Sequence, residues 1–279
     1  MNRTTKIALL AGAAFGMTAS AQTNLDTDRA YAAELLADAG ARASLLQSGN
    51  AGHDGNHFFL ASGDGNYRLN VSGGIQFRYN AYFLDDNDNT TGGADDEDFA
   101  SGFDMTRAFI DFSGNVINPE TIFKIRGEFG ENYGEDSDFG DFELQDAWAQ
   151  HNFENGMSLR FGQFKAPVVY EEFYVDDIHQ LAVDRSVTNE FFSADYTQGV
   201  ALSYRDDNFG GTISMNDGAN TDNTPYFSAS EADIALTARI DFLLAGGDWA
   251  AFNDFTSFRG NDTLDARLGG AIHWQTAGD

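Results

Sequence analysis

The chain has 279 residues, a formal net charge of -28 and no cysteine, with 25 Phe and 30 Gly but only 3 Pro. The lack of cysteine excludes disulfides, a Cys-ligated zinc site and thiol catalysis. The negative charge argues against nucleic acid as a partner, because such binding depends on Lys and Arg that neutralise phosphates. An aromatic content of 14% together with the many glycines is typical of strands and turns rather than helices.

The N-terminus has the pattern of a secretory signal peptide. Two basic residues precede a short apolar stretch, and Ala19-Ser20-Ala21 forms a small-residue cleavage site. The apolar stretch is too short to span a bilayer as a helix. The sequence therefore predicts three parts, which are a signal peptide at 1–21, a helical or periplasmic N-terminal segment at 22–56 and a β domain at 57–279.

Residues 27–47 have a helical pattern. Apolar residues recur there at spacings of 4, 3, 4 and 3, as in a coiled-coil seam about two heptads long. A helix this short is marginal alone. Two interpretations stay open, a tether that promotes oligomerisation and a small helix packed on the β domain.

The stretch from Tyr67 to Leu84 predicts a membrane-spanning strand. Apolar residues such as Ile75 and Phe77 occupy most odd positions, and polar residues occupy most even positions. Alternation sustained over this length is typical of transmembrane β-strands, whereas a soluble strand has about 5–6 residues. Leu144 is out of phase with its neighbours, which a β-bulge near Gln145 would explain. Nine further strands are expected near 106–116, 121–129, 142–153, 157–165, 196–205, 209–216, 233–244, 249–258 and 264–275.

The lengths of the predicted connections alternate. Connections after odd-numbered strands are mostly long, at 85–102, 132–141, 165–194 and 217–230. Those after even-numbered strands are tight, at 117–120, 154–156, 206–208 and 245–247. Outer-membrane barrels have short periplasmic turns and longer outer loops. We therefore expect an all-β, antiparallel transmembrane barrel with about ten visible strands, and we expect the chain to be the front part of a larger barrel.

Two of the predicted long loops are rich in acidic residues. The carboxylates are expected to be solvated, and bridging by a divalent cation is a weaker alternative, since the EF-hand pattern with its sixth-position Gly is absent. No other cofactor is expected. The carboxylates concerned are Asp85, Asp86, Asp88, Asp95, Asp96, Glu97, Asp98, Glu131, Glu135, Asp136, Asp138 and Asp141.

The segment GQFKAPVVYEEF, which begins at residue 162, resembles the phosphate-selective porin O and P family. The family pattern there is Gly-Gln-x-Lys, then Pro, then Glu a few residues on. The matching residues are Gly162, Gln163, Lys165, Pro167 and Glu171. The resemblance extends over about residues 58–275. It implies a sixteen-stranded trimeric porin in outer-membrane lipid, so several strands would be missing from this chain.

The connection at 165–194 follows this motif directly. Connections this long inside a compact β structure are usually functional, and the mixed charges of this one suit a loop that narrows a lumen. We predict that it constricts a passive diffusion channel for ions and small hydrophilic solutes. The residues expected to line the pore or its constriction are Arg68, Arg78, Arg107, Lys124, Arg126, Arg160, Lys165, Glu171, Glu172 and Arg185.

Selectivity in the family is attributed to ladders of basic residues along the pore. Here the predicted inward set also contains the carboxylates of Asp111, Glu128, Glu143, Asp146 and Asp265. Acidic rings favour cations and basic rings favour anions, so this balance argues against phosphate selectivity. A local basic constriction of Arg160, Lys165 and Arg185 that prefers anions is the alternative.

Two other classes of function compete with a pore. An acid/base enzyme would use a pair such as Glu171-Glu172, but no catalytic motif accompanies it, and no enzymatic activity is expected. A soluble or surface-attached β-sandwich that binds carbohydrate would hold its exposed aromatic residues in loops. In this sequence most aromatic residues lie on the apolar faces of the predicted strands.

Overall fold

The computed structural model describes residues 31–38, 40, 50–83, 99–129, 142–226, 228–246, 248–256 and 264–276. The chain divides into two units, Met1–Asn50 and Ala51–Asp279. In the first unit, residues 31–38 are helical, inside the stretch whose periodicity predicts a helix. The predicted signal peptide lies outside the described residues. Among the described helices, none is long and apolar enough to cross a membrane.

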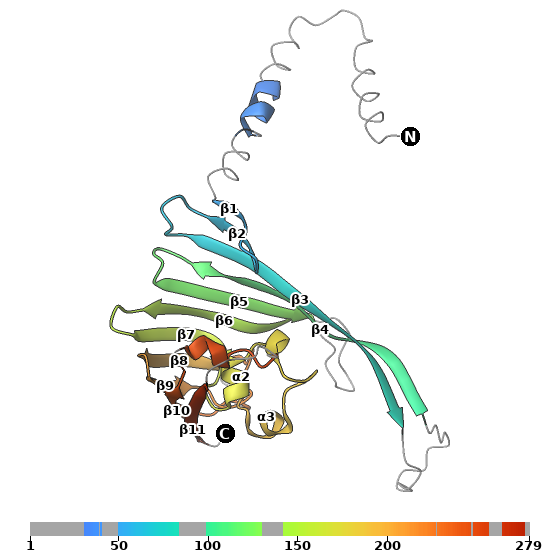
Figure 1. Cartoon of the computed structure of the whole chain (residues 1–279), viewed down its shortest axis with the longest axis vertical. Coiled ribbons are helices and arrows are strands. Elements are labelled where there is room, and N and C mark those ends of the chain that lie inside the picture. The colour runs from blue at the N-terminus through green and yellow to red at the C-terminus, as the bar shows by residue number, and fades with distance from the viewer. Residues whose placement is uncertain are drawn as a thin grey trace, which may run out of the picture. The chain divides into compact units, whose positions relative to one another are not determined.

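The second unit contains a single antiparallel sheet of eleven strands, and each strand pairs with its neighbours in the sequence (Figure 1). The strands are β1 (Ala51–His53), β2 (Phe58–Ala61), β3 (Arg68–Phe83), β4 (Phe99–Asn115), β5 (Thr121–Phe129), β6 (Phe142–Asn152), β7 (Met157–Lys165), β8 (Tyr196–Arg205), β9 (Phe209–Asn216), β10 (Ala235–Ala245) and β11 (Ala266–Gln275). The short helices are α2 (Tyr170–Tyr174), η2 (Asp177–His179), α3 (Val187–Phe192) and η3 (Trp249–Phe252). The sheet curves, and α2 and α3 lie on its concave side (Figure 1).

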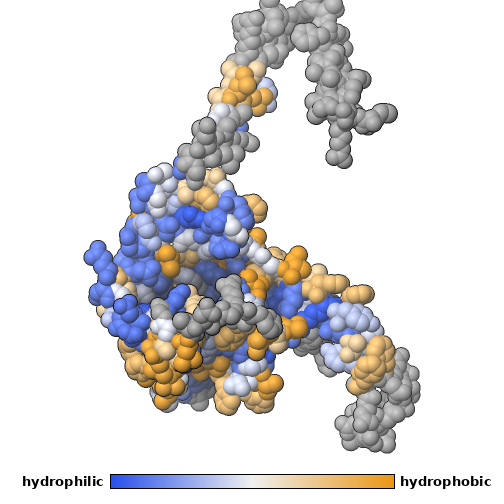
Figure 2. Space-filling view, viewed as in Figure 1, coloured by the Kyte–Doolittle hydropathy of each residue, from blue (hydrophilic) through white to orange (hydrophobic). Residues whose placement is uncertain are grey.

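The polarity of the sheet is inverted relative to a soluble protein. Along β10, Thr237, Arg239 and Asp241 are buried, whereas Ile240 and Phe242 are 51% and 40% exposed. In Figure 2, hydrophobic residues gather on the outside of the sheet. A soluble sandwich buries its apolar strand faces, so this distribution rules out the sandwich and confirms the two-residue alternation.

The side chains that face outward on the other strands are also apolar and exposed. Its members are large apolar side chains that stay at least a third exposed although they lie within regular strands. They include Ile75, Phe77, Tyr79, Phe103, Phe161, Val200, Leu202, Ile213, Met215, Leu236, Leu268, Ile272 and Trp274. An apolar surface of this extent is typical of a surface that contacts lipid or another protein rather than water.

The β-bulge expected near Gln145 is present. Gly127 pairs with Leu144 but Ile125 pairs with Ala147, so two residues of β6 oppose one residue of β5. Because of the extra residue, the side chains of β6 on the two sides of the bulge keep a consistent facing relative to β5. The bulge therefore accounts for the break in the two-residue alternation at Leu144.

Three boundaries differ from the sequence prediction. The sheet has two additional short strands, β1 and β2, before the first predicted strand, and β4 begins at Phe99 rather than near residue 106. The predicted strand at 249–258 is wrong, because Trp249–Phe252 forms the 3-10 helix η3. The Asp248 carboxylate caps this helix by accepting a hydrogen bond from the Ala250 amide at 2.8 Å.

The two ends of the strands differ in their connections. We call the end with the turns at 116–120, 153–156 and 206–208 the tight-turn end, and the opposite end, with 166–195 and 217–234, the long-loop end. Because the strand at 249–258 is absent, the connection from β10 to β11 runs from 246 to 265 and is a long one at the tight-turn end. The alternation of loop lengths therefore holds only as far as β10.

Candidate functional site

The connection at 166–195 crosses the concave face of the sheet. Its first half reaches β10, where the Val168 carbonyl accepts a hydrogen bond from Arg239 Nη1 at 2.9 Å. The Tyr174 hydroxyl donates to Asp241 Oδ2 at 2.9 Å. At the base of the connection, the Ala166 amide donates to the Asp195 carbonyl at 2.9 Å. These contacts hold α2 against the inner face of β10.

The second half of the connection reaches the opposite part of the sheet. Arg126 on β5 pairs with Asp176 at 3.0 Å and with Asp177 at 2.7 Å. Farther along, Asp184 pairs with Arg78 on β3 at 2.5 Å and with Arg107 on β4 at 3.6 Å. The connection is therefore fixed to strands from β3 to β10 through charges that the strands direct inward.

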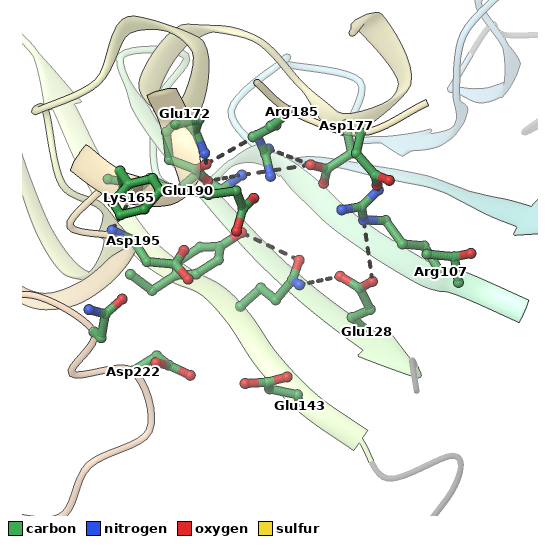
Figure 3. A pocket seen from close by; sticks show the side chains of 18 of the residues that line it. Arg107, Glu128, Glu143, Lys165, Glu172, Asp177, Arg185, Glu190, Asp195 and Asp222 are labelled. Atoms are coloured by element: carbon green, nitrogen blue, oxygen red, sulfur yellow. Dashed lines mark hydrogen bonds and ion pairs between the residues drawn. The ribbon is translucent and has the colours of Figure 1, made fainter. Parts of the chain in front are cut away.

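Glu172 and Asp177 form the centre of this ion-pair network (Figure 3). Lys165 Nζ lies 2.8 Å from Glu172, Arg185 Nε lies 3.1 Å from Glu172, and Arg185 also contacts Asp177. Burial alone would raise the pKa of both carboxyl groups, but Lys165 and Arg185 outweigh it and hold both pKa values below the ordinary range. Both carboxylates stay ionised, and they neutralise the two cations.

The Gly-Gln-x-Lys motif explains how β7 supports this network. Gly162 has a φ of +120°, and an added Cβ would lie 2.2 Å from the Ala147 carbonyl oxygen. The Gln163 amide donates to the Leu144 carbonyl at 2.5 Å and to the Gln145 carbonyl at 2.9 Å, at the β6 bulge. The motif therefore stabilises the bulge and places the Lys165 ammonium beside α2.

A cavity of about 810 Å³ lies between the connection and the long-loop ends of the strands. Four basic residues line it, Arg78, Arg107, Lys165 and Arg185. Eight acidic residues line it as well, Glu128, Glu143, Glu172, Asp177, Asp184, Glu190, Asp195 and Asp222. Burial and the nearby Glu172 carboxylate raise the pKa of Asp195 to about 6. Carboxylates outnumber cations in this lining by two to one.

The structure brings six of the predicted site residues together around the connection. Each of them contacts a charge of the connection or belongs to it, and they are Arg78, Arg107, Arg126, Lys165, Glu172 and Arg185. Glu171 lies in the connection but accepts hydrogen bonds from the Ser186 amide and hydroxyl, at 3.0 and 2.5 Å, and so stabilises the fold of the connection.

Three predicted residues have no ion pair with the connection in the described part of the chain. Lys124 pairs with Asp146 at 2.9 Å. The Arg160 guanidinium lies 4.1 Å from the centre of the Trp148 ring, on the tight-turn side of α2. Arg68 pairs at 2.6 Å with an Asp in the β1–β2 turn. Of the predicted basic constriction, Arg160 and Lys165 line one cavity of about 200 Å³, and Lys165 and Arg185 line another of about 810 Å³, so Lys165 borders both cavities.

The acidic segments considered for divalent cations, 85–98 and 131–141, lie outside the described residues. Within the described ranges no group of three or more His, Asp or Glu side chains is placed to hold a metal ion.

A second inward group of charges was not predicted. Asp241 pairs with Arg239 at 2.8 Å and with Arg267 at 3.2 Å, and the Arg267 guanidinium lies 4.1 Å from the centre of the Tyr174 ring. Arg239 and Asp241 alternate with apolar residues in β10, and this signal was available in the sequence. The packing of Trp249 beside Arg267, at 5.0 Å, was hidden by the strand predicted over 249–258.

Comparison with known proteins agrees with this geometry. No curated protein matches the chain. The family model described as Phosphate-selective porin O and P matches residues 75–248. The match covers more than half of the chain, and it includes the motif on β7, the connection across the concave face and most strands of the sheet. The chain therefore belongs to the phosphate-selective porin O and P family.

Proposed function

We propose that this chain forms the wall and the constriction of an outer-membrane channel through which ions and small hydrophilic solutes diffuse passively. The observation that carries the proposal is the inverted burial of the sheet. Arg126 and Asp241 are 1% exposed on the concave face, whereas Ile75 and Phe77 are 75% and 61% exposed on the convex face. Strands with such faces place lipid outside and water inside.

Closure of the wall is part of the proposal. Within the described residues β1 and β11 are paired only with β2 and β10. An unpaired strand edge is not tolerated in hydrocarbon, because its N–H and C=O groups have no partners there. The edges of β1 and β11 therefore need partners, and the remaining strands of the sixteen-stranded barrel that the family resemblance implies would supply them.

The connection at 166–195 is proposed to be the constriction. It contains three short helical segments, α2, η2 and α3, and is fixed to β3, β4, β5 and β10 by the contacts described above. A segment held from both sides narrows any passage along the strands. Membership of a porin family also favours a channel over an enzyme.

We further propose that the channel does not select phosphate. Basic residues attract anions only while their charge is not cancelled nearby. Arg78, Arg107, Arg126, Lys165 and Arg185 all lie within 4.0 Å of carboxylates. The cavity of about 810 Å³ at the long-loop end is also lined by more carboxylates than cations. The net field there repels phosphate.

Recording in planar bilayers from the purified protein, together with the strands proposed to close its wall, tests the proposal. Stepwise conductance increases are expected, with a reversal potential in a KCl gradient that favours K⁺ over Cl⁻. Replacing residues 170–192 with a short Gly-Ser linker should raise the unitary conductance. Folded protein that inserts without conductance steps would refute the channel, and an unchanged conductance in the linker variant would refute the constriction.

A further inference from the structure

The charge of the concave face changes along the direction of the strands. Three cavities follow one another there, of about 810, 200 and 480 Å³. The first is lined by residues from the long-loop ends of β3 to β8, and the third by residues from the tight-turn ends of β6 to β9. Phe173 and Tyr174 of the connection line both the second and the third cavity. The connection therefore separates a long-loop cavity from a tight-turn cavity.

The long-loop cavity is acidic even after its ion pairs are counted. Its four cations each lie within 4.0 Å of a carboxylate. Glu143, Glu190, Asp195 and Asp222 have no ion pair within the described part of the chain, and Figure 3 shows Glu143, Asp195 and Asp222 along one wall of the cavity. The uncompensated charge of this lining is therefore negative.

The tight-turn cavity has the opposite sign. Arg160 and Arg205 are the charged residues that line it, and no acidic residue of the described chain does so. The Arg160 guanidinium stacks on Trp148 and donates through Nε to Gln150 at 2.9 Å. The Arg205 guanidinium lies 5.1 Å from the centre of the Trp249 ring. Aromatic and amide partners leave a cationic charge uncancelled, so this cavity keeps its positive field.

We propose that the channel is bipolar: its long-loop end concentrates cations, its tight-turn end concentrates anions, and it therefore passes current asymmetrically. Charged clefts with low-dielectric walls raise the local concentration of counter-ions. A voltage that is positive on the long-loop side drives both kinds of ion from the end that concentrates them into the constriction, and the current is high. The opposite voltage removes cations and anions from the constriction, and the current is low. The inference rests on the proposed channel function.

Single-channel currents at equal and opposite voltages test this asymmetry. The channel has no cysteine, so Asp207→Cys provides a unique thiol in an exposed turn at the tight-turn end. Biotinylation and capture by streptavidin from one chamber then identify the orientation of each channel. The current with the long-loop side positive is expected to exceed the reverse current about 1.5-fold in 0.1 M KCl, where the Debye length is about 10 Å. The ratio should approach one in 1 M KCl, where that length is about 3 Å.

Two pairs of substitutions test whether the current asymmetry arises from the charges of the two cavities. Arg160→Gln with Arg205→Gln should make the channel more cation-selective, and Glu143→Gln with Asp222→Asn should make it less so. Either pair should bring the current ratio closer to one. Glu120→Gln with Glu154→Gln, in the background that carries Asp207→Cys, removes two charges from exposed turns and serves as the matched control, with an unchanged ratio.

The outcomes separate the two proposals. Conducting channels with equal currents in both directions in 0.1 M KCl overturn the bipolar arrangement and leave the channel function standing. The bipolar arrangement is also overturned if the arginine pair and the carboxylate pair of substitutions shift the reversal potential in the same direction. Folded, inserted protein without any conductance overturns the channel function and the asymmetry together.

Discussion

Replacing Arg126 with Gln is expected to detach the second half of the constricting connection. The Arg126 side chain is buried and lies 2.7 Å from Asp177, 3.0 Å from Asp176 and 3.8 Å from Asp111. Its guanidinium also lies 3.8 Å from the centre of the Phe109 ring. Removing one partner from a buried ion pair costs about 3–5 kcal/mol, because the remaining carboxylates lose their counter-charge in a poorly hydrated site.

The protein can reduce this cost if the connection moves. Asp176 has a side chain that is already 38% exposed, so a small displacement hydrates its carboxylate. We therefore expect the Arg126→Gln channel to have a larger unitary conductance. We also expect its free energy of unfolding to fall by less than about 3–5 kcal/mol, because the displaced carboxylate is hydrated. Planar-bilayer recording measures the first quantity, and urea unfolding in detergent followed by circular dichroism measures the second.

Arg68→Gln is the matched control for this substitution. Arg68 also faces inward and pairs with a carboxylate at 2.6 Å, but both side chains of that pair are about a third exposed. Exposed pairs contribute about 0–1 kcal/mol, so stability and conductance should change little. If Arg126→Gln and Arg68→Gln give the same conductance as the unaltered channel, Arg126 does not hold the constriction.

Three further predictions concern the wall, the motif and the pH dependence. Ile75→Lys, on the exposed apolar face, should lower the free energy of unfolding by about 2–4 kcal/mol, whereas Gln76→Lys should mainly change conductance; equal effects on stability would show that the assigned facing is wrong. Gly162→Ala should cost about 1–3 kcal/mol in urea unfolding, because φ is +120° and the Cβ meets a β6 carbonyl oxygen. Gly102→Ala, which has open space around its Cβ, should be neutral, and similar losses for both would contradict this reading. Lowering the pH from 7 to 5 should reduce the preference for K⁺, because Asp195, with its pKa raised to about 6, is ionised at pH 7 and protonated at pH 5. The reversal potential of the Asp195→Asn channel should change less between pH 7 and pH 5 than that of the unaltered channel.

The strands and their facing were predictable because they follow from a local rule. In a strand, consecutive side chains point to opposite faces, so the period of two in the sequence reports the facing without any knowledge of the tertiary structure. The same rule located the bulge, since an extra residue in β6 is the simplest way to return Leu144 and Ala147 to a common register. The Gly-Gln-x-Lys motif was recognised from the family, but its role in closing the bulge required the structure.

The ion pairs could not be predicted from the same rule. Arg78 and Asp184 are 106 positions apart, and the connection brings them together only by crossing the sheet. The sequence shows that both signs are present but not which charges cancel, and this distinction decides the selectivity. Likewise, alternation at 249–258 suggested a strand, because the capping carboxylate of Asp248 cannot be distinguished from an ordinary turn residue before the fold is known.

The constricting connection is anchored by two groups of contacts that share no partner. Arg126 holds Asp176 and Asp177, whereas Arg239 holds the Val168 carbonyl at 2.9 Å. The connection from β10 to β11 supports the second group. The Phe255 amide donates to the His179 carbonyl at 2.9 Å, and the Tyr170 hydroxyl donates to the Phe252 carbonyl.

This arrangement predicts how single and double substitutions combine. Arg126→Gln should widen the passage on the side of β5, and Arg239→Gln on the side of β10. Groups without shared partners act additively on stability to within about 0.3–0.5 kcal/mol, so the free energies of unfolding of the double variant should equal the sum of the single changes within that margin. Conductance should rise further in the double variant than in either single one. If instead one substitution already gives the full conductance of the double variant, the connection moves as one rigid piece, and the two anchors are a single mechanical unit.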